Sequence, residues 1–235
     1  ALGGKAAAVA VRFVAIYEKY WVLSSLDGLA PVPAGRFVVH GSHDRGRVPG
    51  HAIAIEIEAA LAFGTGHHGT TRGCLLFLDD ILKRRRPAHV LDVGTGTGVL
   101  AIAAARALHR PVAGGDIDIV AVEAARANAV HNRAGAWLRP VVAKGVGHPV
   151  LRAGAPYDLI FANILARPLM RLAPSIAGGA PPRADVILSG RPSRDVPAVL
   201  PAYRAQGLHL AARRDLEGWA SLHLRHGGAS PRKAF

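Results

Sequence analysis

The sequence predicts an α/β fold in which a mostly parallel sheet is covered by helices. After Pro87, segments with the residue pattern of strands alternate with segments that have the pattern of helices, and this alternation is typical of a parallel sheet. A glycine-rich turn follows the first of these strands, and no helix separates the last two. With 235 residues, of which 50% are hydrophobic, the chain can bury a core large enough for such a domain.

The elements after Pro87 follow from the periodicity of apolar residues. The expected strands are His89–Val93, Val112–Asp116, Leu138–Ala143, Tyr157–Asn163, Ala184–Ser189, Leu208–Arg213 and Trp219–Arg225. The expected helices are Val99–Leu108, Ile119–Arg133, Ala166–Ile176 and Val196–Gln206. Glu217-Gly218 can join the last two strands as an antiparallel hairpin at the sheet edge. Seven strands that end in a hairpin are more typical of a methyltransferase sheet than of an ordinary dinucleotide fold.

Fewer elements are expected before Pro87. Arg36–Val39 and Ile53–Ile57 have the pattern of strands, the polar stretch Gly41–Gly50 between them is an expected loop, and Thr71–Lys83 is an expected helix. Residues 1–28 are expected to form one linker helix or the remnant of another domain. This leaves residues 29–235 as the main α/β domain.

Composition narrows the class of partner. No apolar run approaches the ~18 residues that span a bilayer, and the single cysteine, Cys74, excludes an internal disulfide. We therefore expect a cytoplasmic protein with no membrane partner. The net charge of +13 fits either an acidic partner, such as ribosomal RNA, or a generally basic surface. The basic residues are scattered, which favours the second interpretation, and the one tight run, Lys83-Arg84-Arg85-Arg86, ends an expected helix, where a solvated surface is expected.

The turn after the first strand of the alternating region is the strongest indication of a ligand. It reads Asp92-Val93-Gly94-Thr95-Gly96-Thr97-Gly98, and its glycines allow a sharp turn with close approach of the backbone to a ligand. A dinucleotide fingerprint aligned on Gly94 and Gly96 would need its third glycine at Val99. An acid two residues before the first glycine suits S-adenosylmethionine instead, because Asp92 can accept from its ammonium group and the turn leaves room for its amino-acid end.

Two further side chains lie at the ends of expected strands, where open parallel sheets bind ligands. Asp116 closes the second strand, 24 positions after Asp92, and its carboxylate can accept from both hydroxyls of a ribose. Asp118 is expected to cap the next helix instead. Asn163 closes the fourth strand, and its amide offers a donor and an acceptor where the methyl group would lie. Capping of the helix near Ala166 is the alternative role for Asn163, and the two roles are compatible.

The stretch Leu61–Thr71 is a second candidate for ligand binding. It carries three glycines and three threonines before an expected helix, whose first N–H groups and hydroxyls can bind a carboxylate. Thr71 is the best candidate for direct contact, although it can equally be the helix N-cap. His67 and His68 do not indicate a metal site, because adjacent histidines point in different directions and no ligand spacing accompanies them.

These stretches resemble the ribosomal protein L-eleven methyltransferases, the PrmA family. The resemblance lies in Ala62–Thr71, Val90–Ala105, Gly115–Asn132 and Tyr157–Pro174, and it runs from about Trp21 to Arg225. Its most specific parts are AFGTGHHGTT and ANIL. The resemblance implies a class I methyltransferase fold, Rossmann-like, with seven strands of which the last is antiparallel. It also implies S-adenosylmethionine as methyl donor and lysine or N-terminal amines of a large-subunit ribosomal protein as acceptors.

The resemblance also implies cofactor contacts by particular residues. These are Thr71, Gly94, Asp116 and Asn163. Asp92 and Gly96 join this set from the turn itself, and Phe63 and Thr65 are further candidates from the glycine-threonine loop. The family also carries an N-terminal recognition domain, which residues 1–28 do not supply, so we expect that domain to be truncated and the ribosomal substrate to be bound weakly.

The expected chemistry is in-line methyl transfer from a sulfonium to an amine. The sulfonium is a good leaving group, so positioning can supply much of the catalysis, and Asn163 is the residue expected to orient the amine. No dedicated base is evident, and we expect a monomer. Two alternatives stay open: a methyltransferase for RNA or a small molecule, and a cofactor-binding protein without activity.

Overall fold

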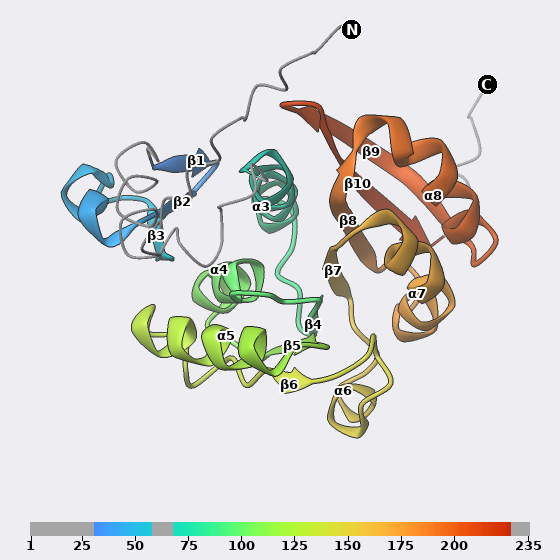
Figure 1. Ribbon diagram of the computed structural model, residues 1–235, viewed down its shortest axis with the longest axis horizontal. Coiled ribbons are helices and arrows are strands. Elements are labelled where there is room, and N and C mark those ends of the chain that lie inside the picture. The colour runs from blue at the N-terminus through green and yellow to red at the C-terminus, as the bar shows by residue number, and fades with distance from the viewer. Residues whose placement is uncertain (1–30, 58–67, 227–235) are drawn as a thin grey trace, which may run out of the picture.

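The computed structural model describes residues 31–57 and 68–226 as a mixed α/β structure with two sheets (Figure 1). The predicted segment 1–28 lies outside the described residues. Within them, no helix is long and apolar enough to cross a bilayer.

The larger sheet has seven strands and confirms the predicted architecture. In chain order these are β4 (Val90–Val93), β5 (Val112–Asp116), β6 (Val141–Val142), β7 (Leu159–Asn163), β8 (Asp185–Pro192), β9 (Leu208–Leu216) and β10 (Trp219–His226). Across the sheet their order is β6-β5-β4-β7-β8-β10-β9. Every neighbouring pair is parallel except those of β10, which is antiparallel to both β8 and β9. The predicted hairpin is therefore present, but β10 lies inside the sheet and β9 forms the edge.

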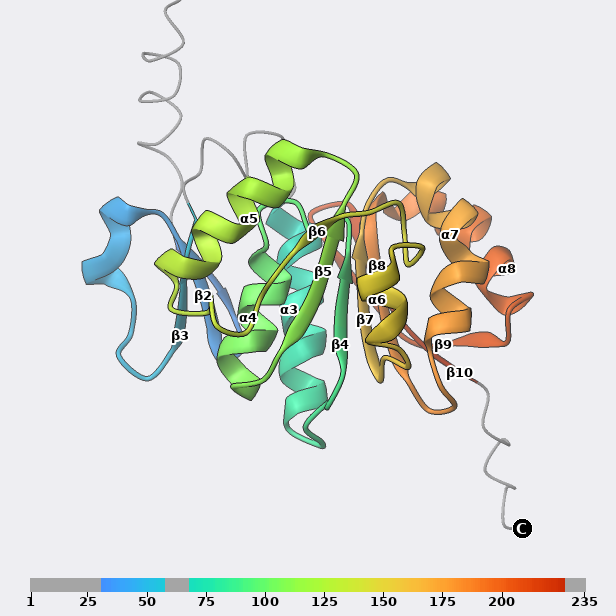
Figure 2. The same cartoon turned by 90° about the horizontal axis from the view of Figure 1, so that it is seen from below.

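Helices cover both faces of this sheet. They are α3 (His68–Leu82), α4 (Val99–Leu108), α5 (Ile119–His131), α6 (Pro149–Ala153), α7 (Ala166–Gly179) and α8 (Val196–Arg204). Figure 2 shows α3, α4 and α5 on one side of β4 and β5, and α6, α7 and α8 on the other. Two buried clusters correspond to these layers, one with Leu78 and Ile102, the other with Leu169 and Tyr203.

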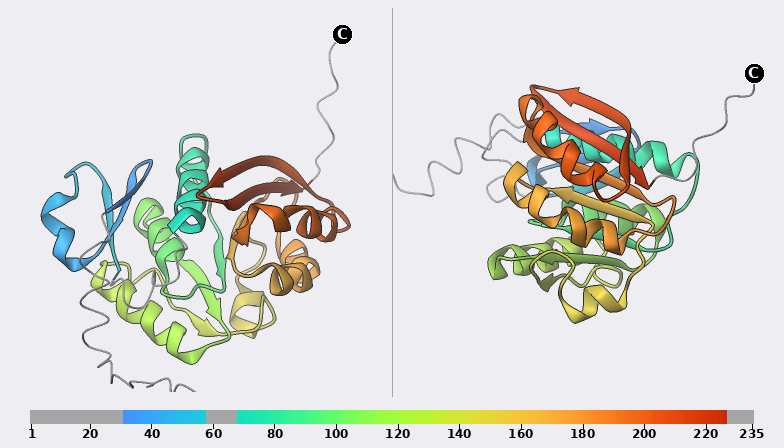
Figure 3. Two further views of the ribbon diagram at one scale, coloured as in Figure 1. Left: turned by 45° about the horizontal axis from the view of Figure 1, so that its top comes forward. Right: turned by 90° about the vertical axis from the view of Figure 1, so that its right-hand side faces the viewer.

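A smaller sheet lies beside the first layer of helices. It consists of β1 (Val32–Ala34), β2 (Phe37–His40) and β3 (Ile53–Glu56), with a 3₁₀ helix, Ser42–Arg47, between β2 and β3. It contacts α3 and α4. In the left view of Figure 3 it lies at one end of the molecule, and the β9–β10 hairpin lies at the other. The amide of Asn132 fixes the end of β3, because Oδ1 accepts from Glu56 N at 2.8 Å and Nδ2 donates to Glu56 O at 2.7 Å.

Several predicted boundaries were wrong, for local reasons. The expected strand Leu138–Ala143 is reduced to β6, since Leu138 makes only an isolated bridge to Val112. Helix α3 begins at His68, three residues before the predicted start, which puts Thr71 inside its first turn. Strand β1 and helix α6 were not predicted, because segments of three and five residues are too short to show a periodicity.

The sequence suggested that the basic run after α3 is solvated surface, but Arg85 in this run makes buried contacts. Arg85 donates to the Oδ2 atom of Asp185 from Nε at 2.9 Å and from Nη2 at 2.5 Å. Asp185 is fully buried at the start of β8, and its Oδ1 accepts from His223 at 2.6 Å and Arg225 at 2.7 Å. Burial alone would raise the pKa of Asp185, but these hydrogen bonds lower it well below its usual range. Asp185 thus ties the α3–β4 connection to β8 and β10.

Asp185→Asn should therefore destabilise the fold by about 2 kcal/mol, because an amide nitrogen cannot accept the hydrogen bonds that the buried carboxylate accepts from charged guanidinium groups. Asp215→Asn is the matched control: Asp215 pairs with Arg213 at 2.7 Å, but its side chain is 45% exposed, so its loss should cost under about 1 kcal/mol. The midpoint of urea denaturation measures both changes. Equal losses would show that Asp185 contributes no more than a surface ion pair.

Candidate functional site

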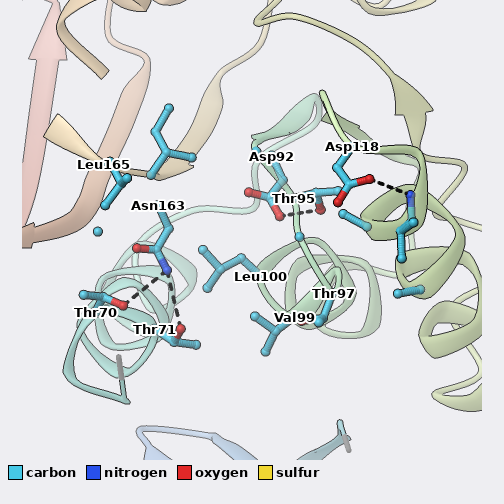
Figure 4. A pocket seen from close by; sticks show the side chains of 17 residues that line it. Thr70, Thr71, Asp92, Thr95, Thr97, Val99, Leu100, Asp118, Asn163 and Leu165 are labelled. Atoms are coloured by element: carbon cyan, nitrogen blue, oxygen red, sulfur yellow. Dashed lines mark hydrogen bonds between the residues drawn. The ribbon is translucent and has the colours of Figure 1, made fainter. Parts of the chain in front are cut away.

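A cavity of about 420 Å³ opens at the carboxyl ends of the central strands (Figure 4). This is the edge at which open α/β sheets bind ligands. Its lining comes from the start of α3, the turn after β4, the start of α5 and the ends of β7 and β8: Thr70, Thr71, Asp92, Gly94, Thr95, Gly96, Thr97, Val99, Leu100, Asp118, Val120, Ala121, Ala124, Asn163, Ile164, Leu165 and Gly190. Segments up to 120 residues apart in the chain thus share one wall.

The turn after β4 requires glycine. Gly94, Gly96 and Gly98 have φ angles of 70°, 54° and 86°, in the left-handed region that other residues rarely adopt. A Cβ atom on Gly94 would lie 2.3 Å from Cγ2 of Ile164, whereas one on Gly96 would meet nothing within 4 Å. Gly94 is therefore held by close packing as well as by φ, and Gly96 leaves open space beside the cavity.

Asp92 presents an unpaired carboxylate oxygen in this cavity. Its Oδ2 accepts from Thr95 Oγ1 at 2.8 Å and from Ala101 N at 3.2 Å, while its buried Oδ1 has no hydrogen-bond partner among the described residues. Burial raises the pKa of Asp92 to about 7, and the nearby charge of Asp116 adds to the effect. A cationic ligand group near Oδ1 would relieve this cost.

Asp116 is placed at the end of β5 but is not itself part of the cavity lining. Its Oδ2 accepts from Gly96 N at 2.9 Å and its Oδ1 from Asp118 N at 3.1 Å, so it holds the glycine turn against the start of α5. Asp118 caps α5 as predicted, accepting from Val120 N at 2.9 Å, and it also lines the cavity, which the sequence did not indicate.

Asn163 joins two predicted site segments. Its Nδ2 donates to Thr70 Oγ1 at 3.5 Å and to Thr71 Oγ1 at 3.4 Å, across 93 and 92 positions of sequence. Its Oδ1 is buried without a partner in the described part of the chain. Asn163 does not cap α7, whose N-cap is Leu165 and lacks a side-chain hydrogen bond. The amide is thus anchored through its nitrogen and has its oxygen free.

Sequence reasoning missed the part of the lining that follows β7 and lies near the end of β8. Leu165 is 65% exposed at the start of α7. Gly190 has a φ of 86°, and a Cβ there would lie 2.6 Å from the backbone N and O of Ile164. The glycine after a buried strand was the available signal, because such a glycine marks close backbone approach.

The remaining predicted site residues cannot be placed. Phe63 and Thr65 lie in the segment 58–67, outside the described residues. Among residues 31–57 and 68–226, no group of three or more His, Cys, Asp or Glu side chains could hold a metal ion.

Comparison with known proteins agrees with the geometry. The model of one family, described as ribosomal protein L11 methyltransferase (PrmA), matches residues 2–227. Proteins named ribosomal protein L11 methyltransferase are similar over most of the chain. The one from Bradyrhizobium diazoefficiens is 55% identical over 225 residues, which is 96% of this chain and 76% of that protein. The one from Mesorhizobium japonicum is 52% identical over 88% of this chain and 71% of that protein.

Solved structures show the same fold. A ribosomal protein L11 methylase from Lactobacillus delbrueckii subsp. bulgaricus superposes with a TM-score of 0.75 and 25% identity, covering 85% of this chain and 100% of that chain. A methyltransferase from Pyrococcus furiosus, with a TM-score of 0.55 and 21% identity over 72% of this chain and 92% of that chain, shows the fold alone.

The raised pKa of Asp92 makes cofactor affinity depend on pH. If Oδ1 accepts from a ligand ammonium, binding requires the ionised carboxylate, which is the minor form below pH 7 because the pKa is about 7. The affinity for S-adenosylhomocysteine should therefore rise by up to about tenfold per pH unit below that pKa and level off above it. Calorimetry at a series of pH values measures this, and Asp92→Asn should bind with an affinity that does not follow pH. A flat profile for the unchanged protein would exclude this contact.

Proposed function

Because the chain belongs to the ribosomal protein L11 methyltransferase family, we propose that it transfers a methyl group from S-adenosylmethionine to amines of ribosomal protein L11. One observation carries the proposal: the buried oxygens Asp92 Oδ1 and Asn163 Oδ1 both have no hydrogen-bond partner among the described residues, and both residues line one cavity. A ligand with donor groups at two points would satisfy both oxygens.

The described residues fit this cofactor. Asp92 Oδ1 has no partner among the described residues and is available to an ammonium group, and Gly96 leaves open space beside the cavity. Each oxygen of Asp116 already accepts one backbone N–H, but a carboxylate oxygen has a second lone pair, so ribose hydroxyls can still donate to it. Thr71 completes the described set, and Phe63 and Thr65 remain candidates from the preceding loop. The cofactor, when bound, supplies a methyl group on a sulfonium.

Asn163 is the residue that we propose orients the acceptor amine. Its nitrogen is occupied by Thr70 and Thr71, so its oxygen is the atom available to accept an N–H from an amine. An amine with an N–H held in this way points its lone pair elsewhere, and an in-line attack needs such alignment. A lysine amine has a reference pKa of about 10.4, and desolvation in the cavity favours the neutral form that can attack.

Two other functions differ in their acceptor. A methyltransferase for RNA or a small molecule would use the same cofactor residues, and a cofactor-binding protein would use them without transfer. The family match favours the protein amine. Acting on a ribosomal protein, the enzyme would work in the cytoplasm, and we propose that it acts as a monomer.

The proposal is tested by methyl transfer from labelled S-adenosylmethionine to three acceptors: purified ribosomal protein L11, ribosomal RNA and small amines. We expect label in L11 alone. Label in RNA or in the small amines with none in L11 would favour the first alternative. Calorimetric binding of S-adenosylhomocysteine without label in any acceptor would favour the second, and binding of NAD in its place would contradict the assignment of the cavity.

Asn163→Ala should reduce the single-turnover rate about 100-fold at saturating cofactor, a loss typical of one oriented polar group in a site. Affinity for S-adenosylhomocysteine should fall much less, since other residues hold the cofactor. Asn128→Ala is the control: its Nδ2 donates to Thr97 O at 2.9 Å, yet Asn128 does not line the cavity. Rapid-quench measurements give the rates. Equal rates for the two variants would remove Asn163 from the catalytic step.

A further inference from the structure

A second cleft, of about 260 Å³, lies between the end of α3 and the β9–β10 hairpin. Figure 1 shows α3 beside this hairpin. Arginines from three separate parts of the chain line the cleft: Arg84 after α3, Arg213 and Arg214 on β9, and Arg225 on β10. Asp80 is the one carboxylate in the same lining. The tight basic run of the sequence therefore meets basic residues of the last two strands.

Arg214 has an unused donor in this cleft. Its guanidinium lies 4.5 Å from the centre of the Phe77 ring, and its Nη2 donates to Asp80 Oδ2 at 2.8 Å. Its other terminal nitrogen, Nη1, is buried and has no hydrogen-bond partner among the described residues. An unsatisfied charged donor is costly, so the positive charge of Arg214 favours an anion in the cleft, although Nη1 itself is not exposed.

Positive charge exceeds negative charge around the cleft. Arg84 donates from Nε to the backbone oxygen of Asp80 at 3.1 Å, and no ion pair joins it to a carboxylate of the described residues. Asp80 itself is shared between Arg214 and Lys83. The carboxylates that pair with the other two arginines are Asp215, for Arg213, and Asp185, for Arg225. Asp185 also pairs with Arg85 and with His223.

We propose that this cleft binds the phosphate backbone of RNA. Guanidinium groups in a fixed fork match the oxygens of a phosphate, and the exposed edge strand β9 offers an open path for a chain to lie along. Lys83 is exposed beside Asp80 of the cleft, where it pairs with Asp79 and Asp80. The two rings in the lining, Phe77 and His223, are both buried, so the described residues offer bases no exposed ring here on which to stack. Binding should therefore depend on salt and not on sequence.

The cleft and the cofactor cavity lie at opposite ends of α3. Thr70 and Thr71, in the first turn, line the cavity, and Asp80, in the last turn, lines the cleft. A helix of 15 residues is about 22 Å long. The chain can therefore hold RNA while its cavity stays open, and the RNA contact is independent of which acceptor is methylated.

The test is fluorescence anisotropy with a labelled oligouridine of about 20 nucleotides, titrated with the full chain at about 50 mM and about 200 mM KCl. Two double variants remove the same charge. Arg84→Ala with Arg213→Ala changes the cleft, and Arg110→Ala with Arg152→Ala changes exposed arginines after α4 and on α6. We expect the cleft variant to bind at least about tenfold more weakly and to lose about 0.7 from the salt slope for each phosphate contact removed. The control should bind as the unchanged protein does.

Equal binding by the two double variants, or binding that does not respond to salt, would overturn the proposal. Displacement of the oligouridine by millimolar inorganic phosphate would also overturn it, since the site would then take a free anion. Affinity for S-adenosylhomocysteine should be unchanged in both variants and shows that they are folded. If the double cleft variant loses that affinity, Arg84→Ala alone decides, because its removal leaves no carboxylate unpaired: a slope reduced by about 0.7 supports the proposal and an unchanged slope contradicts it.

Discussion

The close approach of three strand ends around Ile164 is the constraint on which the rest of the site depends. Gly94 after β4 and Gly190 in β8 both face Ile164, at distances where a Cβ atom would collide with it. Because neither position has room for a side chain, the ends of β4, β7 and β8 can converge, and the space in front of them remains open as the cavity. A larger residue at either glycine would push the wall apart and move Asp92 relative to Asn163.

This convergence brings together two polar groups that burial would otherwise penalise. The Asp92 carboxylate is held by Thr95 and the backbone of Ala101, and the Asn163 amide by Thr70 and Thr71. In each case the described contacts use one side of the group and leave an oxygen without a partner. The fold thus holds two acceptors in fixed positions through contacts of its own, which is the preorganisation that ligand binding and positional catalysis need.

Helix α3 connects the cavity to the basic end of the molecule. Its first turn supplies the threonines that hold Asn163, and its last turn supplies Asp79 and Asp80, which pair with Lys83, Arg36 and Arg214. Just beyond it, Arg85 reaches the buried Asp185. Because the same helix carries cavity residues and charged partners of the sheet edge, its packing against β8 and β10 positions both the cavity and the arginine-lined cleft.

The sequence by itself determined the features that follow from local chemistry. The alternation of strands and helices, the left-handed glycines of the turn after β4, the cap of α5 by Asp118 and the resemblance to one family could all be predicted, because each is written in neighbouring residues. Only the tertiary structure decided which distant groups meet. In the structure Asn163 contacts Thr70 and Thr71, and Asp116 accepts a hydrogen bond from the backbone of Gly96. Strand β10 lies inside the sheet, and Arg85, from a basic run expected to be solvated, pairs with the buried Asp185. The physical reason is that burial and pairing depend on contacts about 20 to 130 residues apart, which no local pattern encodes.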